Sequence, residues 1–143
     1  MTDDDRRLLR RAIELAGMAR VHGDQPFGSL LAGSDGSILV EAQNTVVTDR
    51  DITAHPELKL ARWAARELDA PTAAATTMYT SCQPCTMCQG ALERSGLGRV
   101  VFALSTAQIT ELKGSAAPAA APVRLDGPAM FDEARAPVDG YYT

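Results

Sequence analysis

The sequence predicts an α/β fold in which helices pack on both faces of a sheet that has a hairpin at one side. Predicted strands and helices alternate along the chain. Residues 29–32 and 38–42 are short apolar runs separated by Gly-Ser-Asp-Gly-Ser, a sequence typical of a hairpin turn. The chain has 143 residues, 45% hydrophobic and 22% charged, so we expect one globular domain over residues 1–143.

The first half of the chain begins with a helix over roughly the first twenty residues, where apolar side chains recur at helical spacing. These side chains are Leu8, Leu9, Ala12, Ile13, Ala16 and Ala19. Residues 44–53 are predicted as a loop after the hairpin. A second helix should run from about residue 56 to residue 68, because proline suits the first helical position, where its missing N–H has no partner.

The second half continues the alternation with a strand at 77–80, a helix at 85–94, a strand at 99–103 and a short helix at 107–112. Residues 114–122 are rich in alanine and proline and predict a linker. The linker leads to a C-terminal segment, in which we expect a fifth strand at 123–125 and a terminal helix at 129–135.

Four residues predict a metal centre: His55 and Glu57 at the start of the second helix, and Cys85 and Cys88 at the start of the third. One imidazole and two thiolates bind one zinc ion per chain and leave its fourth position open for water, as in a catalytic site. Two thiolates neutralise the metal, so it acidifies water less than a cationic site would. Glu57 is then the candidate base that moves the water proton.

A structural zinc site is the alternative to a catalytic one. Cys82, Cys85 and Cys88 are evenly spaced, and together with His55 they could close a Cys3His site that has no open position. The chain would then be a non-catalytic zinc-binding module. The placement of Glu57 favours the catalytic interpretation.

The pattern His55-Pro56-Glu57 followed by Pro84-Cys85-Thr86-Met87-Cys88 resembles the zinc-binding signature of the cytidine deaminase superfamily. The similarity extends over about residues 5–113 and is greatest to the branch of guanine deaminases and tRNA adenosine deaminases. It implies a three-layer α/β/α cytidine deaminase-like fold around a five-stranded mixed sheet. It also implies a hydrolase that deaminates cyclic amidines, with Glu57 carrying the proton from water to a ring nitrogen and then to the departing amine.

The resemblance also implies residues that contact the substrate. Asn44 would bond to the edge of the ring, and Phe27 would stack near it. The backbone of Ala54 and of Ser81 would line the pocket. Tyr141, close to the C-terminus, would help to close the site over a small base, either in its own chain or in a partner subunit.

Three departures from the family pattern bear on the substrate. Pro56 stands where alanine is usual, and Gln83 where glutamate is usual. Residues 113–116 offer no carboxylate to bind the N–H groups of guanine, unless the neighbouring Glu111 or the distant Asp139 serves instead. We therefore favour cytosine or an aminotriazine as the substrate, with guanine next.

The charge of the chain indicates which partners it can bind, and its cysteines indicate the cellular compartment. The net charge of −4 and the acidic stretch from 114 to 143 argue against a nucleic-acid surface, so a tRNA adenosine deaminase is the less favoured alternative. No apolar run suits a membrane span or a signal peptide. Cysteines that serve as thiolate ligands suit a reducing compartment, so we expect a cytoplasmic protein. The family resemblance implies a small-molecule substrate and, together with the broad apolar face of the second helix, a homodimer.

Overall fold

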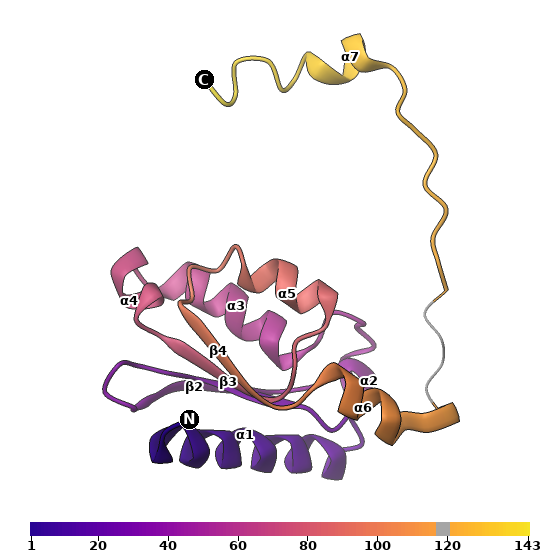
Figure 1. Cartoon of the computed structure of the whole chain (residues 1–143). Coiled ribbons are helices and arrows are strands. Elements are labelled where there is room, and N and C mark those ends of the chain that lie inside the picture. The colour runs from indigo at the N-terminus through magenta and orange to yellow at the C-terminus, as the bar shows by residue number, and fades with distance from the viewer. Residues whose placement is uncertain (117–120) are drawn as a thin grey trace.

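The computed structural model describes residues 1–116 and 121–143, and within them it has a four-stranded mixed sheet in the order β2-β1-β3-β4 (Figure 1). Strand β1 (Gly28–Ala32) pairs antiparallel with β2 (Ile38–Gln43) and with β3 (Thr77–Cys82). Strand β3 pairs parallel with β4 (Arg99–Leu104). The predicted hairpin and the predicted α/β class are confirmed.

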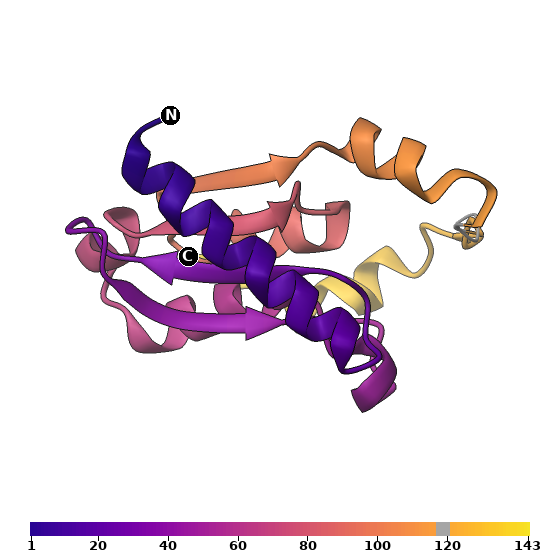
Figure 2. The same cartoon turned by 90° about the horizontal axis from the view of Figure 1, so that it is seen from below.

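Helices cover both faces of this sheet, which gives the three predicted layers. Helix α1 (Asp3–Val21) runs across one face, and α3 (Pro56–Glu67) and α5 (Thr86–Leu92) lie on the other (Figures 1 and 2). Successive strand residues point to opposite faces, so Leu30 packs against α1 while Leu31 packs against α3. The same alternation sends Tyr79 and Met78 into the two separate cores.

Three short helices lie in the connections. Helix α2 (Val46–Asp49) occupies part of the predicted loop, and the sequence analysis missed α4 (Ala70–Ala74), whose first turn is capped by the side chain of Asp69. Helix α6 (Thr106–Lys113) follows β4 as predicted and ends in the 3₁₀ turn η1 (Gly114–Ala116). Among the helices that the structure describes, none is long and apolar enough to cross a membrane.

Helix α1 is fastened to the sheet by a buried carboxylate. Asp5 accepts hydrogen bonds from the Thr2 amide, the Tyr79 hydroxyl and the Arg99 guanidinium, over 2.7 to 3.1 Å. These contacts, with that of Arg99 the strongest, hold the pKa of Asp5 far below its usual range. Burial and the hydrogen bond to Asp5 raise the pKa of Tyr79 to about 12.

The described C-terminal residues, 121–143, form an extended arm that stands apart from the sheet (Figure 1). Helix α7 (Phe131–Arg135) matches the predicted terminal helix. The fifth strand predicted at 123–125 is wrong: Val123 is 81% and Leu125 90% exposed, and a strand needs a neighbouring edge to pair with. The predicted linker at 114–122 begins as η1, and its residues 117–120 lie outside the described chain.

Candidate metal centre and active site

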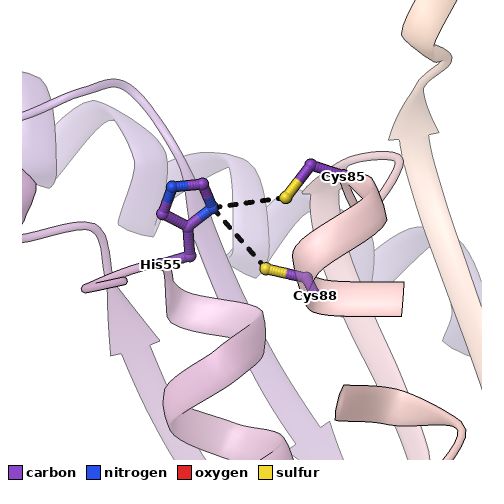
Figure 3. Close-up of side chains that lie close together, drawn as sticks. All are labelled: His55, Cys85 and Cys88. Atoms are coloured by element: carbon purple, nitrogen blue, oxygen red, sulfur yellow. Dashed lines mark hydrogen bonds between the residues drawn. The ribbon is translucent and has the colours of Figure 1, made fainter. Parts of the chain in front are cut away.

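Three side chains converge from two helices at the predicted metal centre (Figure 3). His55 Nδ1 lies 3.7 Å from Cys85 Sγ and 3.5 Å from Cys88 Sγ, and all three ligand atoms fall within 4.8 Å of one another. Tetrahedral zinc with ordinary Zn–S and Zn–N bond lengths would hold nitrogen and sulfur about 3.6 Å apart. The cluster is therefore compatible with one zinc ion.

Each ligand stands at the start of a helix. His55 is the N-cap of α3 and Cys85 is the N-cap of α5, and neither side chain caps its own helix. The imidazole and the thiolate are thus free for a metal, while first-turn N–H groups of both helices face the centre and favour negative charge there. Burial, reinforced by the charge of Glu57, raises the pKa of Cys88, and a metal cation bound at the centre would favour its thiolate form.

Cys82 does not join the cluster. It is buried near the end of β3, and among the described residues only His55, Cys85 and Cys88 bring ligand atoms together. Burial and the nearby charge of Glu57 raise the pKa of the Cys82 thiol. The geometry thus favours three protein ligands over the Cys3His alternative and leaves a fourth metal position for a small ligand.

Glu57 lies beside the metal centre in the first turn of α3, and its side chain is buried. Its two oxygens have different surroundings. Oε1 accepts a 2.8 Å hydrogen bond from Thr80 and lies 3.2 Å from Ser29 Oγ, and both of these residues are on the sheet. Oε2 lies 3.5 Å from Cys88 Sγ, on the side of the ligand cluster. One carboxylate oxygen is therefore anchored while the other faces the metal centre.

A cavity of about 560 Å³ opens beside this centre, a volume that suits a small ring compound. Its walls come from the loop before β1, from the ends of β2 and β3, and from the starts of α3 and α5, and α6 closes one side. The lining residues are Gln25, Phe27, Asn44, His55, Pro56, Glu57, Cys82, Gln83, Cys85, Thr106, Ile109, Thr110 and Lys113.

The structure brings some of the predicted substrate residues into this cavity and leaves others outside it. Phe27 and Asn44 line the cavity. Ala54 and Ser81 are buried beside it and are absent from its lining, and Ser81 Oγ accepts a hydrogen bond from the Gly28 amide. Tyr141 lies in the C-terminal arm, where it is 78% exposed.

Several residues of the site were not predicted from the sequence. Gln25 and Lys113 line the cavity, and Lys113 Nζ lies 5.8 Å from the centre of the Phe27 ring. Ser29 and Thr80 reach Glu57 from the strands. Ser29 and Thr80 meet Glu57 through the pairing of β1 with β3, which no local sequence pattern reveals, and Lys113 depends on how α6 folds back over the pocket.

Gln83 and Pro56, whose roles the sequence left open, have structural explanations. Gln83 Oε1 accepts a 2.9 Å hydrogen bond from the Thr106 amide, which ties the first turn of α6 to the end of β3. Pro56 takes the first position of α3 and is fully buried between His55 and Glu57. Its fixed backbone angle suits that position and helps to hold the two functional side chains in register.

Comparisons with known proteins agree with this site. Residues 2–104 match the family described as "Cytidine and deoxycytidylate deaminase zinc-binding region". A "Probable cytosine deaminase" of Schizosaccharomyces pombe is 31% identical over 99% of this chain and 94% of that protein. A "tRNA-specific adenosine deaminase" of Haemophilus influenzae is 35% identical over 71% of this chain and 58% of that protein. The crystal structure of guanine deaminase from Bacillus subtilis superimposes with a TM-score of 0.79 and 30% identity, over 99% of this chain and 94% of the other.

Proposed function

Because the chain belongs to the zinc-binding cytidine and deoxycytidylate deaminase family, and is therefore a hydrolytic deaminase, we propose that it acts on a free nucleobase or a similar amino-substituted ring. The observation that carries the proposal is the meeting of three metal ligands with one oxygen of Glu57 beside a cavity of small-molecule size. A zinc-binding module would need neither the open metal position nor the carboxylate next to it.

Zinc bound at this cluster would hold and acidify the attacking water. Glu57 Oε2, which faces the cluster, takes the proton of the water as oxygen bonds to the ring carbon that bears the amino group. The same carboxylate passes this proton to the ring nitrogen, then takes the remaining proton from the hydroxyl group on the ring carbon and gives it to the departing amine. The C–N bond breaks, ammonia leaves, and the ring keeps a carbonyl in place of its amino group.

The hydrogen-bonding groups of the pocket support a substrate that presents acceptors. Asn44 Oδ1 already accepts the Val46 amide at 3.0 Å, so the amide nitrogen of Asn44 faces Gln25 and the cavity as a donor. Lys113 adds a cation, and Glu57 is the only carboxylate in the lining of the described cavity. The carbonyl of cytosine or the ring nitrogens of an aminotriazine match such donors.

Guanine fits these groups less well, because its N1–H and 2-amino group require acceptors. Glu111 does not line the cavity, and Asp139 is engaged with Arg135 within the arm, over 3.0 Å. We therefore propose a cytosine- or aminotriazine-type substrate. The name of the Schizosaccharomyces pombe relative supports this choice, and the Bacillus subtilis structure makes guanine its nearest competitor.

A tRNA substrate is the second candidate, favoured only by the similarity to tRNA-specific adenosine deaminases. The net charge of −4 and the acidic C-terminal arm oppose the binding of phosphates.

We further propose that the protein is a homodimer in the cytoplasm. The arm exposes several large apolar side chains, among them Phe131, Tyr141 and Tyr142, which require a surface to cover them. A second copy would supply that surface and bring Tyr141 to a pocket. A reducing compartment keeps the cysteine ligands available for the metal.

A screen for released ammonia tests the substrate. Zinc-loaded protein should turn over cytosine or an aminotriazine, and protein stripped of metal should turn over neither. Lys113→Glu, which replaces a donor by an acceptor, should shift the ratio of kcat/KM values toward guanine. Efficient turnover of guanine alone would refute the proposed substrate, and turnover only of a tRNA anticodon stem would refute the free-base proposal.

A further inference from the structure

A pair of buried hydroxyl groups lies directly beneath Glu57. Ser29 on β1 and Thr80 on β3 are opposite each other in the antiparallel register, and both are fully buried. They point to the face of the sheet that α3 covers, and their hydroxyl oxygens are 2.8 Å apart. The next residues along the two strands on that face, Leu31 and Met78, are apolar core residues. The two hydroxyls are therefore polar groups within an otherwise apolar stretch of this face.

Both hydroxyls reach the same carboxylate oxygen. Thr80 Oγ1 donates to Glu57 Oε1 at 2.8 Å, and Ser29 Oγ, which lies 3.2 Å from that atom, donates to the nearer Thr80 Oγ1 at 2.8 Å and so supports it. Thr80 also lies 3.2 Å from the carbonyl oxygen of Cys82, but a hydroxyl has one proton and the contact with Glu57 is shorter. Glu57 Oε2 receives no such contact from the sheet and faces Cys88 instead.

We infer that Thr80 and Ser29 are positioning residues for the proton transfer by Glu57, an inference that rests on the proposed deaminase function. Without them the carboxylate could rotate about its last side-chain bond, because that torsion has a broad energy profile. With Oε1 held against the sheet, Oε2 stays directed at the metal centre and the reacting atoms. A displacement of a catalytic group by about 1 Å costs a rate factor of about 100, so this anchoring should affect the chemical step.

The alternative is that the hydroxyls merely satisfy each other inside the core. The two roles differ in what they change. An anchor for Glu57 affects kcat, whereas a packing role affects stability and leaves the chemistry of the folded enzyme intact. Substrate binding should not change, because neither hydroxyl lines the described cavity.

The test compares substitutions in the full-length, zinc-loaded protein. Thr80→Val removes the hydroxyl and keeps the shape of the side chain, so kcat should fall about 10- to 100-fold while KM and zinc content stay at the wild-type values. Thr80→Ser, which restores a hydroxyl, should recover most of the lost kcat. The matched control is Thr76→Val, because Thr76 is equally buried but its hydroxyl bonds to the carbonyl oxygen of Thr72. It should leave kcat unchanged.

Wild-type kcat in fully zinc-loaded Thr80→Val would overturn the inference, as would equal losses of kcat in Thr80→Val and Thr76→Val. If Thr80→Val does not fold, Ser29→Ala decides: a lower kcat with unchanged KM supports the anchor, and an unchanged kcat contradicts it. The variant Glu57→Gln distinguishes a failure of the proposed deaminase function from a failure of the proposed anchoring role of Thr80. Full activity in Glu57→Gln refutes the proposed function itself, whereas an inactive Glu57→Gln beside a fully active Thr80→Val refutes the anchor alone.

Discussion

His55 and Cys85 combine two tasks in single residues, because each is a candidate metal ligand and also the first boundary residue of a helix. Neither side chain forms a capping hydrogen bond with its helix, so each is available to bind a metal and does not stabilise the helix end. Their spacing to Glu57 and Cys88 follows from the helical start, which is why a short sequence pattern could locate the centre. The side chains that hold Glu57 from the sheet depend on strand register and were not accessible in this way.

Substitution of Cys82 and of Cys85 should distinguish a thiol that binds the metal from one that only lies near it. We expect Cys82→Ser to retain about one zinc per chain, because the Cys82 thiol lies outside the ligand cluster, whereas Cys85→Ser should lose most of its zinc. Metal analysis after exhaustive dialysis measures both. If Cys82→Ser lost zinc to the same extent as Cys85→Ser, the site would be a closed structural one.

Among the elements, α6 has the most direct influence on the pocket, because it supplies four of the lining residues and is tied to β3 through Gln83. Its own start is fixed by reciprocal hydrogen bonds between Ser105 and Gln108. The Gln83 side chain therefore contributes to the position of this wall relative to the metal centre, together with the hydrogen bond from the Gln83 amide to the Leu104 carbonyl.

Gln83→Ala should raise KM about two- to tenfold and leave zinc content unchanged, since it removes one hydrogen bond of about 0.5–1.5 kcal/mol that holds α6. The matched variant Gln83→Glu keeps an oxygen that accepts from the Thr106 amide and should bind substrate nearly as well as wild type. Steady-state kinetics on the best substrate decide. An unchanged KM in Gln83→Ala would mean that α6 does not depend on this contact.

The fastening of α1 by Asp5 predicts a pH dependence of stability. The depressed pKa of Asp5 means that its contribution is complete above about pH 5 and is lost as the pH falls below about 4, toward the lower folded value. Asp5→Asn should therefore lower the urea midpoint at neutral pH, and its difference from wild type should shrink in acid. Asp4→Asn is the control, because the Asp4 side chain is 71% exposed. Equal midpoints of wild type and Asp5→Asn at pH 7 would contradict the role of this carboxylate.

At the scale of the whole molecule, the C-terminal arm contrasts with the compact sheet and its helices. Every described residue from 121 to the end is exposed, and the hydrogen bonds of the arm stay within it. Tyr141 and Tyr142 pack edge-on against each other, with ring centres 4.9 Å apart. Such a segment gains stability when a second surface covers its apolar side chains.

Light scattering coupled to size exclusion tests the proposed dimer. The full chain should elute with twice the 15.2 kDa mass of one chain, and a variant that ends after Lys113 should elute as a monomer with a higher KM. A full chain that scatters as a 15.2 kDa monomer at micromolar concentration would contradict the proposed assembly.

Much of the architecture was predictable because its signals are local. Helical spacing of Leu8 and Ala12, the proline at the start of α3 and the turn between β1 and β2 each act within a few residues. The prediction of a fifth strand at 123–125 was wrong because a short segment such as Val-Arg-Leu becomes a strand only where a sheet edge is available. Likewise Lys113 and Thr80 enter the site through contacts between elements, which no local pattern encodes.

Comparison of wild type with Glu57→Gln tests whether this carboxylate moves the protons of a hydrolytic deamination. Both proteins should bind zinc and unfold alike, because the glutamine keeps the shape of the side chain and its oxygen can still accept the hydrogen bond of Thr80. Ammonia release should be at least about 100-fold slower in Glu57→Gln, since the carboxylate that moves every proton is gone. Near-wild-type turnover by zinc-loaded Glu57→Gln would contradict the account.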